Sequence, residues 1–181
     1  EPLTYRRYIS INTEILGAVI TNATGCSLAE YMEEKLWKKL DTAEDAYWTL
    51  SNGTELAMGG LSVSLRDYAR FARLYLEGGA YNGQQILPQQ WVKDSLDVSA
   101  DYSKPGANGD AYNAIGYGYQ WWVPQGSQGE FMAIGVYGQW IYVNPVTRVI
   151  IVKTSADPDF MEDGYELKHV EFFRAISNGI A

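Results

Sequence analysis

The stretch FMAIGVYGQWIYVNPVTRVIIVKT, residues 131–154, decides the class of fold. It contains apolar runs rich in β-branched and aromatic residues, which predict strands over 131–136, 139–143 and 148–154. The last two runs flank Asn144-Pro145-Val146-Thr147, a composition typical of a tight turn. We therefore expect these two strands to form an antiparallel hairpin. A further strand is predicted just upstream, over 118–123.

Helical signals fill the part of the chain that precedes the strands. A helical pattern over about 13–23 ends at a glycine stop, Gly25. Ser27 and Glu30 then form a capping box, which predicts the start of a second helix. Its apolar positions continue on one face as far as Trp37, so we expect the helix to reach that residue.

Two further helices and a closing helix follow. Ser64 and Asp67 predict the start of the third helix, which is expected to bury Leu65 and to end at Gly78-Gly79. Pro88 suits the first turn of a short fourth helix. The closing helix is predicted over 165–177, and residues 41–62 and 101–118 are expected to be loops.

This order of elements predicts an α+β fold, an antiparallel β-sheet flanked by helices. The chain has 181 residues, 46% of them apolar and 20% charged, which suits one packed domain or a large piece of one. No internal repeat or domain linker interrupts it. We therefore expect residues 1–181 to belong to a single domain.

The net charge of −8 argues against two classes of partner. Nucleic acids and anionic membrane surfaces both require clustered Lys and Arg, so neither is expected to bind here. A solvated acidic surface explains the charge. Cys26 is the single cysteine, so no internal disulfide is possible and the redox compartment stays open between cytoplasmic and periplasmic or secreted.

The amino terminus, Glu1-Pro2-Leu3-Thr4, lacks both an initiator Met and the pattern of a signal peptide. Helical material begins almost at once after it. We therefore expect the chain to start inside a longer gene product or after a cleavage.

Few residues of this chain suit catalysis by themselves. His169, the only histidine, stands among apolar residues of a helical run, and no Gly-x-Ser-x-Gly motif accompanies it, so a structural position is expected. Zinc sites that need several His or Cys ligands are excluded. The acidic stretch 157–163 misses the register of a calcium-binding EF-hand loop and is expected to be solvated. No metal or organic cofactor is expected.

Large aromatic residues crowd one third of the chain. Side chains on a strand alternate between the two faces of the sheet, so these residues have two interpretations. They form an aromatic core, or some of them line a pocket at the end of the sheet. The residues concerned are Tyr117, Tyr119, Trp121, Trp122, Tyr137, Trp140 and Tyr142.

The stretch YISINTEILG, residues 8–17, resembles the tyrosine motif of the serine β-lactamase and penicillin-binding-protein family. The resemblance is to the class C-like members, in the branch of esterases and 6-aminohexanoate-oligomer hydrolases. It extends in the same order along nearly the whole chain, over 23–31, 36–37, 45–48, 59–61, 66–71, 116–122 and 135–139. It implies a β-lactamase/transpeptidase-like fold of which this chain is the incomplete, carboxy-terminal portion.

The family's first motif is Ser-x-x-Lys, whose serine attacks the acyl carbon. No serine of this chain has Lys three positions later, so the resemblance implies that the nucleophile lies upstream. In the second motif, Tyr8 matches the tyrosine that relays a proton, which a phenol can do beside a cation that favours phenolate. Ser10 stands where the family's substrate-contacting Asn would be, a departure shared by the esterase and amidase branch. A buried aromatic at a helix entry is the structural alternative for Tyr8.

The third motif, Lys-Thr-Gly on a strand, aligns with Ala133-Ile134-Gly135, so only its glycine is present. Loss of the lysine removes the cation that binds the carboxylate of lactam substrates. The resemblance implies that Val136 donates its backbone N–H to the oxyanion, that Gly135 lets substrate lie along the strand, and that Trp122 lines the acyl pocket. An ordinary strand with a bulge, and a core position for Trp122, are the structural alternatives.

Two functions follow as hypotheses. The first is part of a serine hydrolase that cleaves a small-molecule ester or amide through a seryl acyl-enzyme and is inactive without the missing amino-terminal part of the same enzyme. The second is a non-catalytic, aromatic-rich module that binds a carbohydrate or a peptide. A cleaved enzyme whose two chains stay associated is also open, and it would leave a sheet edge for the missing part to cover.

Overall fold

The computed structural model describes residues 3–107 and 114–180 of the chain. The described residues group into two compact units, one formed by Glu1–Arg6 with Ala72–Ala181 and the other by Arg7–Phe71. The larger unit contains the main sheet, and the smaller one contains helices and short strand pairs. That both units form a single domain stays a prediction.

The larger unit is built on an antiparallel sheet of five strands in the order β11-β10-β9-β8-β7. The strands are β7 (Gly116–Tyr117), β8 (Trp122–Val123), β9 (Phe131–Gly135), β10 (Gln139–Asn144) and β11 (Val149–Lys153). The predicted antiparallel hairpin is confirmed, with Tyr142 opposite Ile151. The continuous strand predicted over 118–123 is wrong: Gln120 adopts a φ of 66°, so the chain turns back and β7 pairs with β8.

β10 lies between β9 and β11, and its residues Trp140–Asn144 are all buried. Met132 faces Tyr142 across the β9–β10 pair, and Ile134 faces Trp140, so these four side chains share one face of the sheet. The aromatic residues singled out in the sequence are therefore only partly core: Trp121, Trp140 and Tyr142 are buried, and Tyr117 and Trp122 are half-buried. Tyr119 and Tyr137 are exposed.

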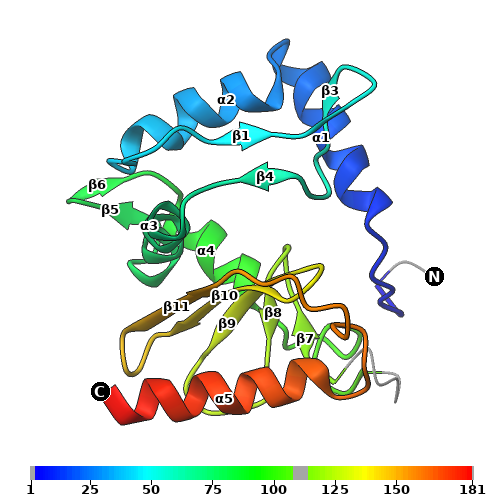
Figure 1. Ribbon diagram of the computed structural model, residues 1–181, viewed down its shortest axis with the longest axis vertical. Helices are drawn as coiled ribbons and strands as arrows, with labels where there is room; N and C mark the ends of the chain where they lie inside the picture. The colour runs from blue at the N-terminus through cyan, green and yellow to red at the C-terminus, as the bar shows by residue number, and fades with distance from the viewer. Residues whose placement is uncertain (1–2, 108–113, 181) are drawn as a thin grey trace. The chain divides into compact units, whose positions relative to one another are not determined.

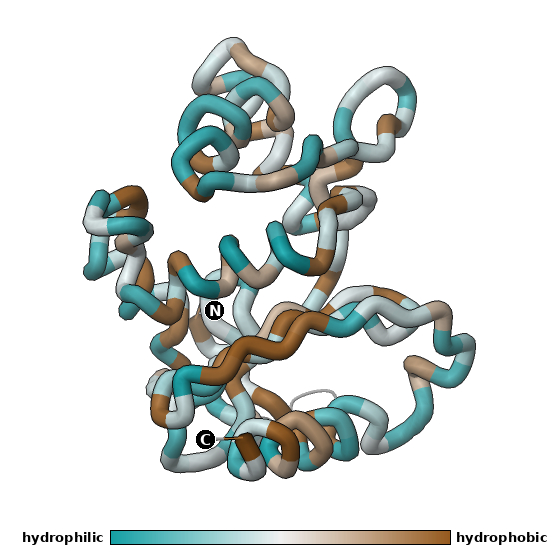
Figure 2. The backbone as a smooth tube through the Cα atoms, turned by 60° about the vertical axis from the view of Figure 1, so that its left-hand side comes forward, coloured by the Kyte–Doolittle hydropathy of each residue, from teal (hydrophilic) through white to brown (hydrophobic). Residues whose placement is uncertain are grey.

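Helix α5 (Tyr165–Ile180) covers this face of the sheet (Figure 1). Its residues Tyr165, Val170 and Phe173 pack in one cluster with Met132, Trp140 and Tyr142. Figure 2 shows the apolar colour gathered along the central strands, whereas α5 alternates between apolar and polar segments. The amphipathic helix thus buries one side against the sheet and leaves the other in solvent.

The opposite face of the sheet packs against the end of α3 (Leu65–Leu76). Tyr75 lies 4.6 Å from Trp121 between ring centroids, and Trp121 lies 5.1 Å from Phe131. Phe131 points away from its neighbour Met132 because successive strand residues alternate. The hairpin of β5 (Ala80–Tyr81) and β6 (Gln84–Gln85) follows, and then α4 (Gln89–Leu96), whose N-cap is Pro88.

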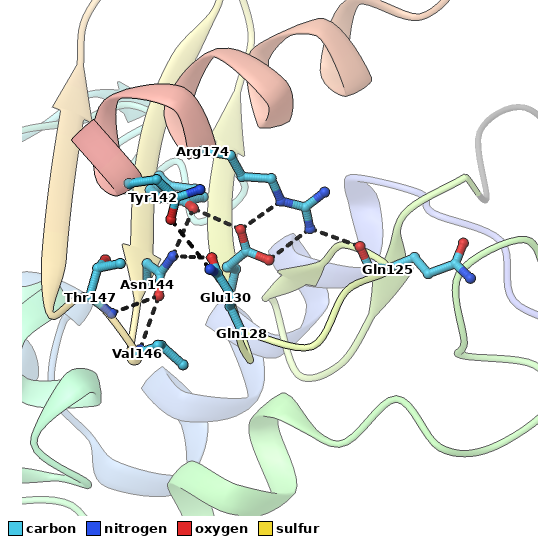
Figure 3. A network of polar contacts seen from close by, with 9 residues as sticks. Gln125, Gln128, Glu130, Tyr142, Asn144, Val146, Thr147 and Arg174 are labelled. Atoms are coloured by element: carbon cyan, nitrogen blue, oxygen red, sulfur yellow. Dashed lines mark hydrogen bonds and ion pairs between the residues drawn. The ribbon is translucent and has the colours of Figure 1, made fainter. Parts of the chain in front are cut away.

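A polar network joins α5 to the sheet beneath it (Figure 3). The Arg174 guanidinium donates to both carboxylate oxygens of the buried Glu130, each at 2.7 Å. The Tyr142 hydroxyl donates to the same carboxylate at 2.8 Å. Burial raises the pKa of Tyr142 to about 12, and the bond to Glu130 adds to the effect. Burial alone would also raise the pKa of Glu130, but Arg174 and Tyr142 lower it below 4.5.

The smaller unit begins with α1 (Ile11–Thr24) and α2 (Leu28–Lys35). The predicted glycine stop is confirmed, because Gly25 caps α1 with a left-handed φ of 71°. The predicted capping box of Ser27 and Glu30 is confirmed in both directions. The second helix is shorter than predicted: it ends at Lys35, and Trp37 begins a separate turn, η1 (Trp37–Lys39).

Residues 41–62, predicted to be a loop, contain four strands of two residues each. β1 (Tyr47–Trp48) pairs with β4 (Leu61–Ser62), and β2 (Leu50–Ser51) pairs with β3 (Thr54–Glu55). Such short ladders leave no alternating pattern in the sequence, which is why the loop prediction was wrong here. In the segment 101–118, β7 begins at Gly116, and residues 108–113 lie outside the described residues.

Ser64 and Asp67 lie at the start of α3 as predicted, but the carboxylate of Asp67 does more than cap this helix. It accepts from the backbone N–H groups of Ala43 and Glu44 at 3.0 and 3.2 Å, and from Ser64 and Arg70. Burial alone would raise the pKa of Asp67, and these bonds lower it instead. Leu65 is 47% exposed, so the prediction that α3 buries it is wrong.

A helix needs about 20 apolar residues to cross a lipid bilayer. None of the helices within residues 3–107 and 114–180 is both long and apolar enough to cross a membrane.

Candidate functional site

The end of β9 and the turn into β10 form the most distinctive backbone of the larger unit. Gly135 is the last residue of β9 and pairs with Gln139, the first residue of β10. Between them, Val136 is 64% exposed and Tyr137 is 54% exposed. Tyr137 has a φ of 60° and Gly138 a φ of 78°, and a left-handed conformation is uncommon for a residue as bulky as tyrosine.

Residues of β11 and of the loop that follows it support this turn through hydrogen bonds and ring packing. The backbone N–H of Asp157 donates to the Tyr137 carbonyl at 3.1 Å, and the Lys153 ammonium donates to the Gly138 carbonyl at 3.2 Å. The Tyr137 ring packs against Phe160, with 5.0 Å between ring centroids. The turn is therefore tied to the chain on the far side of β10.

Tyr165, at the start of α5, completes the support. Its hydroxyl donates to the Asp157 carboxylate at 3.0 Å and lies where a Cβ on Gly138 would overlap it. Burial raises the pKa of Tyr165 to about 12, and the bond to Asp157 contributes. The pKa of Asp157 is lowered by the backbone N–H of Asp159 and by the Tyr165 hydroxyl. The pair is thus a neutral phenol on a carboxylate over the neutral pH range.

Trp122 begins β8 and sits opposite Met132 of β9. Its ring lies 4.6 Å from the Tyr117 ring, and it packs half-buried against the cluster under α5. The structure therefore gives Trp122 a share in the core. Its expected place in the wall of an acyl pocket stays a prediction.

Tyr8 and Ser10 belong to the 7–71 unit, whereas Trp122, Gly135 and Val136 belong to the unit with the sheet. Tyr8 is 49% exposed and precedes α1. Ser10 is exposed at the N-cap position of that helix, and its side chain makes no capping bond. The structure brings Gly135 and Val136 together at one strand end, and the approach of Tyr8 to them stays a prediction.

His169 occupies a structural position. Its ring stacks on Trp140 at 5.0 Å between centroids, and its Nδ1 lies 3.0 Å from the Tyr165 carbonyl. Among residues 3–107 and 114–180, no group of three or more His, Cys, Asp or Glu side chains is arranged to hold a metal ion.

A hollow of about 620 Å³ lies within the 7–71 unit, between α2, η1 and the β1–β4 pair. None of the residues predicted for chemistry lines it. The ring N–H groups of Trp37 and Trp48 in its wall donate to the carbonyls of Glu44 and Leu56. We therefore attribute the hollow to the packing of this unit rather than to acyl transfer.

Gln139 and Ser155 support the strand end, because the Gln139 side chain bonds to the backbone of Ser155. The sequence offered no signal for this contact. Their contact depends on where β11 ends relative to β9, which neither a motif nor a spacing reveals. A glutamine directly after a Tyr-Gly turn was the one local feature that set Gln139 apart.

Comparison with known proteins places this chain in a family. The Beta-lactamase family matches residues 1–173. The chain is 34% identical over 158 residues to the 6-aminohexanoate-dimer hydrolase of Paenarthrobacter ureafaciens, a match that covers 84% of this chain and 40% of that protein.

Solved structures agree. A Bacillus anthracis protein provisionally named a 6-aminohexanoate-dimer hydrolase has a TM-score of 0.86 at 33% identity, covering 98% of this chain and 45% of that one. A β-lactamase from Mycobacterium bovis has a TM-score of 0.66 at 19% identity, covering 87% and 58%. The chain thus spans less than half the length of the relatives that it matches at more than 30% identity.

The predicted fold class is confirmed by these likenesses, with helices and antiparallel sheets in the arrangement of the β-lactamase/transpeptidase type. The match of the family along residues 1–173 confirms the resemblance that begins at Tyr8. The chain belongs to the β-lactamase family of serine hydrolases and corresponds to part of such an enzyme.

Proposed function

We propose that the full-length gene product is a serine hydrolase that cleaves an ester or amide bond of a small molecule through a seryl acyl-enzyme. The observation that carries the proposal is the family match over residues 1–173, together with 34% identity to a 6-aminohexanoate-dimer hydrolase. The serine and lysine of Ser-x-x-Lys come from outside this chain in this proposal. Residues 1–181 alone are expected to be inactive.

Tyr8 acts in this proposal as the general acid and base. Its phenol passes a proton from the attacking serine to the leaving group, and the lysine of the missing motif favours the phenolate that this requires. The exposure of the Tyr8 side chain, 49%, is compatible with contact to substrate. Ser10, exposed two residues later, is proposed to contact the substrate.

Val136 and Gly135 supply the electrostatic part of the mechanism. The backbone N–H of Val136 is proposed to donate to the oxygen of the tetrahedral intermediate, where a preorganised donor stabilises the developing charge. Gly135 has no side chain to hold the substrate away from the strand, and Val136 is exposed just after it. Trp122 is proposed to form one wall of the acyl pocket.

The relatives guide the choice of substrate. Linear 6-aminohexanoate dimers contain an amide bond between flexible chains, so we propose small linear esters and amides. Ala133-Ile134 stands where the family has Lys-Thr, so we do not expect the carboxylate recognition that lactam substrates need. The proposed chemistry uses neither a metal nor an organic cofactor.

The test uses the full-length gene product with a fluorophosphonate probe, a p-nitrophenyl ester and the 6-aminohexanoate dimer. We expect the probe to label one serine upstream of residue 1. Tyr8→Phe should lower kcat by about a thousandfold, the scale of general acid–base catalysis, without changing the melting temperature. Tyr5→Phe is the matched control, because Tyr5 is an exposed tyrosine three positions earlier.

Two results would contradict the proposal in different ways. Unchanged turnover in Tyr8→Phe removes Tyr8 from the mechanism but leaves the hydrolase. A full-length protein that neither hydrolyses nor takes up the probe is not a serine hydrolase.

A non-catalytic binding module is the second candidate, and one observation favours it. Trp91 and Tyr119 are both exposed, with their rings 5.5 Å apart, as in surfaces that stack on sugars. Such a module would bind an oligosaccharide or peptide in calorimetry and would lose the binding in Trp91→Ala, with no labelled serine in the full-length protein.

A further inference from the structure

The residue proposed to donate to the oxyanion is part of a strained turn. Val136 precedes Tyr137 and Gly138, both with left-handed backbone. A donor of this kind works only if its N–H already points at the position of the developing charge. An exposed residue beside a strained turn does not keep one orientation unless its neighbours fix it.

The side-chain amide of Gln139 connects Val136 to the neighbouring segment at Ser155. Its Nε2 donates to the Val136 carbonyl at 3.3 Å and also to the Ser155 carbonyl. Its Oε1 accepts from the backbone N–H of Ser155 at 3.2 Å. The reversed amide would set an oxygen against two carbonyl oxygens, so the hydrogen bonds fix its orientation.

Val136 is therefore restrained from both sides. The residue before it, Gly135, pairs with Gln139 in the strand ladder. The carbonyl of Val136 itself is held by the Gln139 amide. The loop contacts act further along, since Asp157 bonds to the Tyr137 carbonyl and Lys153 to the Gly138 carbonyl.

Close packing adds a second restraint. A Cβ placed on Gly135 would lie 3.0 Å from the Gln139 Cβ, tighter than an ordinary contact. The glycine thus lets the Gln139 side chain fold back over the strand end. The strand pairing and the packing thus fix Gly135, and the Gln139 amide fixes the carbonyl of Val136 next to it.

We propose that Gln139 is a positioning residue that holds the Val136 N–H in the direction required for oxyanion stabilisation, with Ser155 as its anchor on the far side of β10. This inference rests on the proposed function. In this scheme the segment just after β11 controls the catalytic geometry through one amide side chain. Gln139 itself touches neither substrate nor nucleophile in this scheme.

The test uses Gln139→Ala and Gln139→Glu in the full-length gene product, with a p-nitrophenyl ester as substrate. A donor that is present but misdirected should lower kcat by about 10- to 100-fold. KM should stay within about threefold, because the ground-state carbonyl gains little from the donor. Gln139→Glu should lose at least as much as Gln139→Ala, since its carboxylate faces the Val136 and Ser155 carbonyl oxygens.

Affinity for a transition-state analogue separates positioning from a general structural role. A boronic acid that forms a tetrahedral adduct should bind the variants more weakly, by the same factor as the fall in kcat/KM. Binding of the hydrolysis product should not change. Titration with the fluorophosphonate probe corrects each kcat for the fraction of active protein.

Gln85→Ala is the matched control. The Gln85 amide also donates to two backbone carbonyls, those of Gly78 at 3.0 Å and Leu87 at 2.5 Å, but in the β5–β6 hairpin. Its removal deletes the same kind of bond and should leave kcat within about twofold.

The outcomes distinguish this inference from the function on which it rests. If the parent protein hydrolyses the ester and Gln139→Ala keeps its kcat, the positioning role is wrong and the hydrolase stands. If kcat and product binding fall together, Gln139 has only a structural role and the inference is overturned. If the parent neither hydrolyses nor takes up the probe, the proposed function fails and the inference fails with it.

Discussion

The two ends of the β9–β10 hairpin contrast sharply. At the end formed by Phe131 and Val143 both side chains are buried, and the neighbouring Glu130 and Asn144 are buried with hydrogen-bond partners. At the other end, Val136 and Tyr137 are exposed and the backbone turns through the left-handed region. We call the buried end at Phe131 and Val143, where the polar groups have hydrogen-bond partners, the closed end. We call the exposed turn at Val136 and Tyr137 the open end.

The difference indicates that the two ends of the hairpin affect different properties of the protein. A left-handed conformation at a bulky residue costs on the order of 1 to 3 kcal/mol, and it persists only where surrounding contacts enforce it. Those contacts come from Asp157 and Lys153, which bond to the carbonyls of Tyr137 and Gly138, and from Phe160. The buried end is stabilised separately, by packing and by the Glu130–Arg174 pair. Changes at the closed end should therefore act on stability alone, whereas changes at the open end should act on turnover as well as on stability.

The largest effect on stability is expected for Glu130→Ala. It leaves the Arg174 guanidinium and the Tyr142 hydroxyl without their shared acceptor. We expect the free energy of unfolding to fall by about 3 kcal/mol, at the low end for a broken buried pair because the Arg174 side chain is 30% exposed. Urea denaturation of the full-length protein measures it.

Glu77→Ala is the control, since Glu77 pairs with Arg148 at the surface and should contribute less than about 1 kcal/mol. Equal losses in the two variants would show that burial of Glu130 does not increase the contribution of its ion pair to stability. A large fall in kcat of folded Glu130→Ala would break the proposed division between the two ends.

The same substitution predicts a pH dependence. Arg174 and Tyr142 outweigh burial and lower the pKa of Glu130 in the folded state below 4.5. The stabilisation from the charged form is then fully present above about pH 4.5 and is lost as the pH falls through the lower, folded-state pKa. The stability difference between the parent and Glu130→Ala should therefore shrink from pH 6 to pH 3, in urea titrations at several pH values. A constant difference would show that the charge contributes nothing.

At the open end, Gly138→Ala should cost about 2 kcal/mol. The added methyl group would overlap the Tyr165 hydroxyl, and the residue would keep a φ of 78°. Gly164→Ala is the matched control, because Gly164 has a φ of 77° and open space around its Cβ position. The difference between the two variants in thermal unfolding isolates the overlap from the backbone strain. Equal losses would mean that the turn shifts to accommodate the added methyl group, so that the overlap with the Tyr165 hydroxyl has no cost.

Local signals predicted the end of α1, the start of α2 and the hairpin. The capping box of Ser27 and Glu30 spans three residues, so the pattern and the hydrogen bonds coincide. The turn at Asn144 was equally local: its side chain accepts from the N–H groups of Val146 and Thr147. The same reasoning failed over 41–62, because strands of two residues have no periodicity to detect.

The site was predictable only in part. The resemblance to the family singled out Gly135 and Val136, and the structure places them at a strand end. The resemblance could not reveal the residues that support the two ends of the hairpin. Glu130 and Arg174 are 44 residues apart, and Gln139 and Ser155 are 16 apart. Such pairings are set by how the strands and α5 pack, which a single sequence does not encode in any short pattern.

The smallest effect expected is that of Tyr142→Phe at the closed end. It removes one donor to the Glu130 carboxylate and one acceptor for Asn144, while the Arg174 pair and the ring packing against Phe173 remain. We therefore expect a loss of about 1 kcal/mol in urea denaturation, with kcat unchanged. A loss as large as that of Glu130→Ala would mean that the hydroxyl, and not the guanidinium, keeps the buried carboxylate charged. In that case the closed end would be stabilised by a cooperative network, and its contributions could no longer be added bond by bond.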